Sequence, residues 1–370
     1  MKKIALFILI LCSLLEATSE ELYVEDGLSE QEISFLKAVV LDKNTNEPVP
    51  FAHVFINQTT CGTYTTIDGV FELKCDFDIT DLKLFISHVG YEDIIIEINS
   101  TWENDIVIPM IPAANELKEI TILSDRDDKS RKRNLRIFKN EFIGRDKSRK
   151  KCFIENPEVI YFNDSLDVLW AFSDAPIQVT NLYTGYKIEY HLEYFAFNKK
   201  TTLPMYSGNC SIQEMDTSDF ELKQKWIDQR KTSYMGSLTH FFHSLLSENL
   251  NESGYSLLNE KSLKIDIDNK EENTIVSVSE NIDVVYENEF EPRSYRTWLN
   301  RVLSREPYVG GGIKYGDDPR YQVTSVSPIN GKILINKNGQ ILNEKDIVLN
   351  GYMGWERVAD IMPFNYKIQQ

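Results

Sequence analysis

Alternation of apolar and polar residues is the main structural signal between residues 35 and 124. Short runs carry it, each bounded by turn-forming residues, at 35–41, 52–56, 61–66, 70–75, 82–88, 94–98 and 106–110. In the run 82–88, Leu82, Leu84 and Ile86 form one apolar face, although Phe85 interrupts the pattern on the other face. Short strands at this spacing are typical of an all-β sandwich, which we predict for this region.

Residues 152–370 mix strand and helix patterns. Residues 186–194 alternate apolar and polar positions without a break, which predicts a strand. Helical spacing predicts helices near 224–230 and over 237–250, and a short closing helix is expected at 355–362, before a proline. Further strand-like runs lie at 263–267, 274–278, 282–286 and 332–336. We therefore expect a mainly β protein, in which the β-sandwich is followed by a larger α+β domain of unknown function.

The segment 125–151 between these two regions has a composition of its own. It holds 12 Lys and Arg residues against 5 Asp and Glu residues. Leu135, Phe138 and Phe142 lie at helical spacing within it, so we predict a basic helical linker with one apolar stripe. The stripe is expected to pack on the next domain. Peripheral contact of the basic residues with an anionic membrane is the alternative interpretation.

The net charge of −17, from 40 basic and 57 acidic residues, excludes a broad nucleic-acid-binding surface, which would need basic stripes. The charge is unevenly distributed along the chain. Residues 20–124 hold 5 basic and 20 acidic residues, or −15, and residues 152–370 are also acidic. Two acidic domains thus flank a basic joint, and we expect the linker to dock on a neighbouring acidic surface.

The first 19 residues have the layout of a secretory signal peptide. Two lysines precede an uncharged apolar run at 4–15, and small residues follow around Ala17. The apolar run is shorter than the roughly 20 residues that a membrane-spanning helix needs. We therefore predict an exported protein, periplasmic or associated with the outer membrane, with a signal peptide at 1–19 and a flexible lead-in at 20–34.

Cys61, Cys75, Cys152 and Cys210 remain once this leader is removed, and an even number permits disulfides in an exported protein. Residues 65–71 are typical of a hairpin with Asp68 at its tip. A register symmetric about Asp68 would place Cys61 opposite Cys75, within reach of a disulfide. Two buried free thiols are the alternative.

Several segments of the predicted sandwich carry a family pattern. They lie at residues 38–42, 48–54, 62–71 and 87–91, and residues 117–122 follow as an exit segment. On these segments the region 35–124 resembles the carboxypeptidase regulatory-like domain, a transthyretin-like, Ig-like β-sandwich found widely in exported proteins of the Bacteroidetes type. Ala38 departs from the pattern, which usually has glycine there. The remainder resembles the partner region that often follows this domain, on residues 152–157, 182–186, 234–241 and 351–356.

The residues that carry the resemblance are expected to serve the scaffold. They are Pro48, Ala52, Asp68, Gly69, Phe71, Gly90 and Tyr91. Proline stiffens a strand edge, the Asp-Gly pair suits a tight turn, and glycine permits a bend beside a packed tyrosine ring. The resemblance therefore implies an accessory role and transfers no activity.

The family name suggests a metallocarboxypeptidase, which would need a zinc site, typically of two histidines and a carboxylate. The five histidines of the sequence include no His-Glu-x-x-His motif, and none has a glutamate three positions later. His240 and His243 share a predicted helix and are the candidate metal ligands, although the phenylalanines between them suggest core packing. We therefore predict no catalytic residues, no cofactor-binding residues and no cofactor.

These observations predict a non-catalytic binding or assembly module of the bacterial cell envelope. Its partner would be an envelope protein or a surface polymer. The alternative is a peptide or glycan hydrolase with an unrecognised active site in residues 152–370.

Overall fold

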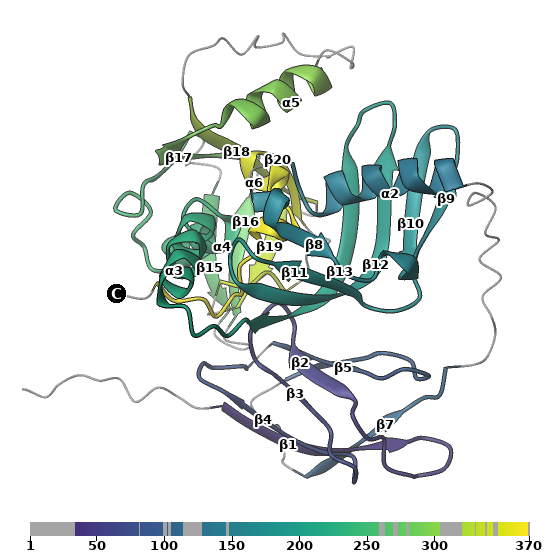
Figure 1. Ribbon diagram of the computed structural model, residues 1–370. Helices are drawn as coiled ribbons and strands as arrows, with labels where there is room; N and C mark the ends of the chain where they lie inside the picture. Colours follow the sequence, from purple (N-terminus) through teal and green to yellow (C-terminus); the bar gives the residue numbers. More distant parts are fainter. Residues whose placement is uncertain are drawn as a thin grey trace, which may run out of the picture.

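A computed structural model describes residues 34–80, 82–98, 102, 105–113, 128–145, 148–258, 263–268, 273–278, 281–303, 320–329, 331–336, 339–342 and 347–368 (Figure 1). The predicted signal peptide at 1–19, nearly all of the lead-in at 20–34, the exit segment 117–122 and the first residues of the linker lie outside the described residues. Within the described part of the chain, no helix is both long and apolar enough to cross a membrane.

The N-terminal part is a β-sandwich, as predicted. One sheet has the order β4(Val70–Cys75), β1(Ser34–Asp42), β7(Ile106–Met110), and the other has the order β3(Gly62–Tyr64), β2(His53–Ile56), β5(Lys83–Ser87), β6(Ile94–Glu97). Strand β1 is antiparallel to β4 and parallel to β7. Apolar side chains of both sheets are buried between them, among them Val40 and Phe71 of one sheet and Val54, Leu84 and Ile86 of the other.

The tight turn at Gly69 forms as predicted, but the expected hairpin register is wrong. The backbone of Gly69 has a φ of 72°, and a Cβ there would lie 2.5 Å from the carbonyl oxygen of Val40, so the position requires glycine. Strand β3 pairs with β2, whereas β4 pairs with β1. The two arms of the turn therefore belong to different sheets. The structure joins Cys61 to Cys75 in a disulfide with a Cα–Cα distance of 5.6 Å, which links the two sheets of the sandwich.

A six-stranded antiparallel sheet forms the middle of the molecule. Its strands are β8(Cys152–Ile154), β9(Ile160–Asp164), β10(Val168–Ser173), β11(Ile177–Asn181), β12(Tyr186–Asn198) and β13(Pro204–Glu214). The long strand β12 pairs with β11 at its beginning, with β10 at its end and with β13 along its length. The predicted strand at 186–194 is thus the centre of this sheet.

The helix predicted in the basic linker is α2(Asp128–Phe142), which lies along the six-stranded sheet (Figure 1). Phe138 and Phe142 are fully buried in the same apolar cluster as the sheet residues Phe162 and Phe195. The helix is therefore part of the core of the second domain and not a free connection. Short 3-10 helices, η1(Ser148–Lys151) and η2(Pro157–Val159), follow it.

The C-terminal part packs helices against two smaller sheets. One sheet has the order β14(Tyr255–Leu257), β17(Ile282–Phe290), β18(Tyr321–Pro328), β20(Ile347–Gly351), and the other has the order β15(Leu263–Asp268), β16(Asn273–Val278), β19(Lys332–Ile335). The helices are α3(Phe220–Tyr234), α4(Leu238–Leu246), α5(Arg293–Leu303) and α6(Tyr352–Trp355). Phe241 and Phe242 of α4 pack on the buried residues of these sheets.

The prediction of a closing helix at 355–362 is wrong. Helix α6 ends at Trp355, and the next residues form only the 3-10 turn η5(Val358–Asp360). The amide of Ala359 donates to the carbonyl oxygen of Ile143, and its own carbonyl accepts from the Asn181 side chain. These bonds to two other parts of the chain replace the bonds of a continuing helix.

A tie loop, residues 57–60, joins the sandwich to the rest of the molecule. The amide of Gln58 donates to the carbonyl of Cys210 (2.7 Å), and the amide of Ile212 donates to the carbonyl of Thr59 (3.1 Å), which makes a parallel bridge to β13. The C-terminal segment contacts the same loop, because the amide of Phe364 donates to the carbonyl of Gln58 (2.9 Å). Thr60 and Asn365 are joined by two further hydrogen bonds. Main-chain and side-chain hydrogen bonds thus hold the sandwich against the rest of the molecule.

Candidate functional site

Two features that could support a function lie where the sandwich contacts the rest of the chain. One is a cluster of ionisable side chains, and the other is a cavity.

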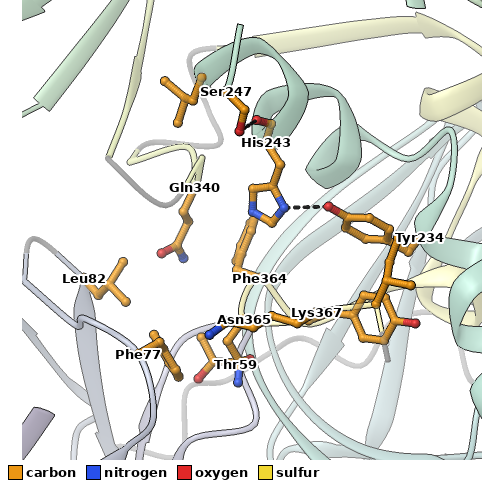
Figure 2. A pocket seen from close by; sticks show the side chains of 13 residues that line it. Thr59, Phe77, Leu82, Tyr234, His243, Ser247, Gln340, Phe364, Asn365 and Lys367 are labelled. Carbon is orange, nitrogen blue, oxygen red and sulfur yellow. Dashed lines mark hydrogen bonds between the residues drawn. The ribbon is translucent and has the colours of Figure 1, made fainter. Parts of the chain in front are cut away.

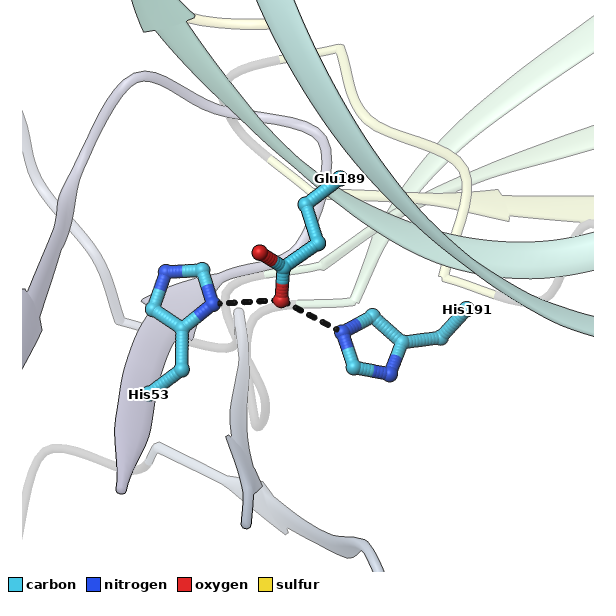
Figure 3. A group of neighbouring side chains, drawn as sticks. All are labelled: His53, Glu189 and His191. Carbon is cyan, nitrogen blue, oxygen red and sulfur yellow. Dashed lines mark hydrogen bonds and ion pairs between the residues drawn. The ribbon is translucent and has the colours of Figure 1, made fainter. Parts of the chain in front are cut away.

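The interface cluster consists of His53, Glu189 and His191 (Figure 3). His53 lies on β2 of the sandwich, whereas Glu189 and His191 lie two positions apart on β12 and so project from the same face of the sheet. The other face of β12 carries Tyr190, which packs against Phe142 of α2. The sandwich and helix α2 therefore cover opposite faces of the central strand.

One carboxylate oxygen holds the interface cluster together. Glu189 Oε1 lies 2.9 Å from His53 Nδ1 and 3.2 Å from His191 Nε2. The second oxygen, Oε2, accepts a hydrogen bond from Gln178 Nε2 at 3.1 Å. The other ring nitrogen of His191, Nδ1, lies 3.6 Å from the Asp93 carboxylate of the sandwich. Glu189 and Asp93 thus flank the His191 ring.

The charges in the interface cluster are stabilised by one another. Burial alone would raise the pKa of Glu189, but hydrogen bonds from His191 and His53 outweigh it and hold that pKa well below its usual range. Burial would lower the pKa of His191, yet hydrogen bonds to Asp93 and Glu189 raise it. The cluster therefore favours an ionised Glu189 carboxylate.

Aromatic rings fix the two imidazoles from the sides. His53 stacks on Tyr64 with ring centroids 4.7 Å apart, and it also contacts Phe55 at 4.7 Å. His191 packs against Phe85, again at 4.7 Å, and against Phe55. Phe55 and Phe85 point away from the sandwich core and are nonetheless buried, because the second domain covers them. The residue that interrupts the alternation of 82–88 is therefore an interface residue.

The interdomain cavity has a volume of about 500 Å³ (Figure 2). Its walls come from the sandwich, the end of α3, helix α4, the turn before β20 and the C-terminal segment. The lining residues are Thr59, Phe77, Leu82, Tyr234, His243, Leu246, Ser247, Gln340 and residues 364–368. The size and the mainly apolar lining with a few polar groups are typical of small-ligand sites.

Neighbouring groups determine the hydrogen bonds and the protonation of the polar side chains in the interdomain cavity. The Tyr234 hydroxyl lies 2.7 Å from His243 Nδ1. Burial and the nearby Tyr366 raise the pKa of Tyr234 to about 12, so its phenol stays protonated at neutral pH. Gln340 is buried, and its Oε1 atom has no hydrogen-bond partner among the described residues. The wall of the cavity thus contains a buried amide whose oxygen atom is itself shielded from solvent.

The two candidate metal ligands of helix α4 have different surroundings. His240 is buried, and its Nδ1 accepts a hydrogen bond from the amide of Gly236 (3.1 Å), with the Tyr255 hydroxyl 3.0 Å away. His243 faces the interdomain cavity instead. Among the side chains that the structure describes, the group close enough to share a metal ion is the interface cluster, and neither of these two histidines belongs to it.

The residues of the family pattern lie where a scaffold needs them. Ala52 and Phe71 are buried in the sandwich core, and Pro48 forms an isolated bridge with Leu41. Gly90, like Gly69 after Asp68, has a positive φ. The hydroxyl of Tyr91 donates to the Asp42 carboxylate at 2.9 Å.

Two of the described cysteines form no disulfide. Cys152 and Cys210 are both buried, and burial raises the pKa of Cys152 to about 12. A thiol with such a pKa is a poor nucleophile, so a structural role in the core follows.

Sequence reasoning missed the interface cluster, whose His53 and Glu189 lie 136 positions apart. The unbroken alternation of 186–194 was a usable signal, because it places Glu189 and His191 on the face opposite the tyrosines of the core. Nothing local in the sequence indicates that His53 of the sandwich lies against that face.

Comparisons with known proteins identify the sandwich. Residues 36–122 match the CarboxypepD_reg-like domain, which confirms the family prediction for this region. No curated protein matches the chain.

Several solved structures share weak similarity with the chain. A DUF3823 family protein from Bacteroides ovatus has 12% identity and a TM-score of 0.16, with 50% of this chain and 83% of that chain covered. A protein described as membrane-associated and of unknown function, from Bacteroides fragilis, has 9% identity and a TM-score of 0.17, covering 68% and 89%. A 9R-lipoxygenase from Cyanothece has 13% identity and a TM-score of 0.18, covering 61% and 48%. At these TM-scores we base no argument on them.

Proposed function

We propose that this chain, whose residues 36–122 form a CarboxypepD_reg-like domain, is a non-catalytic binding module of the bacterial cell envelope. Its ligand-binding site is the interdomain cavity, and its ligand is an apolar or aromatic group of an envelope protein or a surface polymer. The observation that carries the proposal is the cavity lining, in which aromatic and aliphatic side chains surround the buried Gln340 amide.

The position of the interdomain cavity supports a binding role. Thr59, Tyr234 and Gln340 come from parts of the chain that are far apart in sequence. Main-chain bonds join the tie loop to β13 and to the C-terminal segment, and Gln340 Nε2 donates to the carbonyl of Asn57 at 3.4 Å. A preorganised cavity loses little conformational entropy when a ligand enters. This arrangement suits recognition of a specific group.

The protonation states of two side chains, Tyr234 and His240, suit a binding site. Tyr234, in the cavity, keeps its proton at neutral pH because burial raises its pKa. His240, behind the cavity, stays neutral because burial lowers its pKa to about 4. General acid–base catalysis is most efficient with a pKa near the working pH, and neither group has one.

An envelope location is supported by two features. The disulfide between Cys61 and Cys75 is typical of oxidising compartments outside the cytoplasm. The basic and apolar N-terminal residues have the layout of an export signal.

The proposal is tested by screening the full chain against a short-peptide library and an array of envelope glycans. The variant Leu246→Trp fills the cavity, and Leu166→Trp is the matched control, because Leu166 is 96% exposed. We expect a peptide or glycan that binds the natural chain and the control alike but binds Leu246→Trp at least about tenfold more weakly. If every peptide and glycan binds the three proteins equally or not at all, the proposal is wrong. Turnover of a peptide or glycan would replace it with the hydrolase alternative.

A further inference from the structure

We propose that His53, Glu189 and His191 bind one divalent transition-metal ion, of which Zn²⁺ is the type, and that this ion bridges the sandwich and the six-stranded sheet. The proposal is independent of the function proposed for the interdomain cavity. It rests on the donor atoms, on the contacts that orient them and on their place between two domains.

The donor atoms have the chemistry and nearly the spacing of a zinc site. Two imidazole nitrogens and one carboxylate oxygen are common zinc ligands, with metal–ligand distances of about 2.0–2.2 Å. Neighbouring ligands around a tetrahedral ion are then roughly 3.3 Å apart. The carboxylate oxygen of Glu189 lies 2.9 Å and 3.2 Å from the two imidazole nitrogens, and all of the donor atoms lie within 4.8 Å of one another. A small opening of the two rings around Glu189 would admit the ion.

Outer contacts orient each ligand as they do in established metal sites. A ligating histidine usually gives its other N–H to a carboxylate, which keeps the metal-facing nitrogen unprotonated. His191 can adopt this arrangement, because Nδ1 faces Asp93 and can keep its proton, while Nε2, which hydrogen bonds to Glu189, would release its proton on binding the ion. Gln178 binds the second oxygen of Glu189 and leaves Oε1 for the ion. Tyr64 holds the His53 ring by stacking.

Burial and charge also suit a bound cation. The His191 side chain is 8% exposed, whereas those of His53 and Glu189 are 13% and 21% exposed, so the interface cluster is mostly enclosed but keeps some contact with solvent. An ion can therefore enter, and water can complete its coordination. Glu189 and Asp93 together bring two carboxylates to the site, which balance the charge of a divalent ion.

The site has a structural consequence because its ligands come from both sides of an interface. His53 belongs to the sandwich, and the other two ligands belong to β12. A ligand set that exists only in the assembled molecule makes the free energy of metal binding a contribution to domain association. The bound ion would therefore hold the two domains together.

The experiment uses the full chain, stripped of metal with EDTA and desalted, and titrated with Zn²⁺, Co²⁺ or Mg²⁺ in a calorimeter. The variants Glu189→Gln and His53→Gln remove a ligand, and Asp93→Asn changes an outer contact. His88→Gln is the control, because His88 lies on the same sandwich and packs on Tyr91, outside the interface cluster. Thermal unfolding without metal checks that each variant is folded.

We expect one Zn²⁺ per chain, visible absorption of bound Co²⁺, and a rise of the thermal midpoint with Zn²⁺ but not with Mg²⁺. Glu189→Gln and His53→Gln should weaken Zn²⁺ binding at least about tenfold, and Asp93→Asn should weaken it by about tenfold. His88→Gln should bind as the natural chain does. The proposal is overturned if the natural chain binds no Zn²⁺, or if both ligand variants are folded and bind it unchanged.

Discussion

At the scale of single residues, Phe85 shows how a side chain on the outer face of a sheet can become part of a core. It lies directly opposite Ile95 in the pairing of β5 with β6, so the two side chains share a face. Phe85 is 2% exposed, whereas Ile95 is 48% exposed. The difference arises because His191 of the second domain covers Phe85 and leaves its neighbour in solvent.

This contrast gives a prediction about stability. Phe85→Ala removes a buried ring and should lower the free energy of unfolding by about 3 kcal/mol, as for other buried phenylalanines. Ile95→Ala, on the same face, should cost less than about 1 kcal/mol because the side chain is half exposed. Urea denaturation of both variants measures the two values. Equal losses would show that the second domain does not cover Phe85.

His240 gives a second residue-scale prediction, on pH. Burial and the nearby His243 lower its pKa from 6.5 to about 4, and the rings of Tyr234, Tyr255 and Tyr286 surround it. The unfolded chain therefore takes up a proton near pH 6.5, whereas the folded chain takes it up only near pH 4. Stability from this residue is present above pH 6.5 and is lost as the pH falls towards 4, by about 3 kcal/mol.

Urea denaturation between pH 7 and pH 4 measures this loss of stability. His240→Asn places an amide oxygen near Nδ1, where it can still accept from the Gly236 amide, but it cannot titrate. The difference in stability between the natural chain and this variant should shrink as the pH falls. A difference that stays constant across the range would contradict the prediction.

At the scale of elements, helix α2 uses its basic residues within its own domain. The guanidinium of Arg131 donates to the carbonyl oxygens of Ile160 and Pro157, at 2.9 Å and 3.0 Å. Arg133 pairs with Asp164 at 2.6 Å. These contacts fit the expectation that the basic segment docks on a neighbouring surface. They also occupy the guanidinium groups of Arg131 and Arg133, which an anionic membrane surface would otherwise attract.

Two variants on α2 distinguish the stabilisation by these specific contacts from the effect of the positive charge of the helix. Arg131→Ala should lower the free energy of unfolding by about 1.5–3 kcal/mol, because two backbone carbonyls lose a charged donor. Arg136→Ala, which removes the same charge from an exposed position of the helix, should stay within about 0.5 kcal/mol. Thermal or urea denaturation provides the comparison. A similar loss in both variants would point to charge alone.

The strands also show which features of the structure could be predicted from the sequence. The runs 70–75 and 106–110 coincide with β4 and β7, because alternation of side chains is a local property of a strand. The partner of each strand is not local. Cys61 and Cys75 flank one turn, yet their strands enter different sheets, so a register deduced from the turn was wrong. The interface cluster depends on the same kind of distant pairing, which explains why the sequence did not reveal it.

At the scale of the whole molecule, the domains are expected to unfold together. The tie loop adds main-chain bonds to β13, Lys83 Nζ donates to the carbonyl of Leu342 at 2.8 Å, and Phe55 and Phe85 are buried only in the assembled chain. Separation of the sandwich would expose these phenylalanines and break all of these bonds.

Differential scanning calorimetry measures this coupling. We expect one transition, with a calorimetric enthalpy close to the van't Hoff enthalpy. Phe85→Ala should weaken the coupling and broaden or split the transition. Two separate transitions in the natural chain would show that the sandwich unfolds on its own.

The bond between Thr60 and Asn365 has a consequence for the order of events in folding, because it joins residues 305 positions apart. Synthesis delivers the N-terminal sandwich first, and contacts of such long range form late. Until Phe364 and Asn365 arrive, the carbonyl of Gln58 and the amide of Thr60 lack the partners that they have in the finished molecule. A chain interrupted upstream of these residues would leave its tie loop accessible to proteases. The same contact that completes the fold would thereby distinguish finished molecules from interrupted ones.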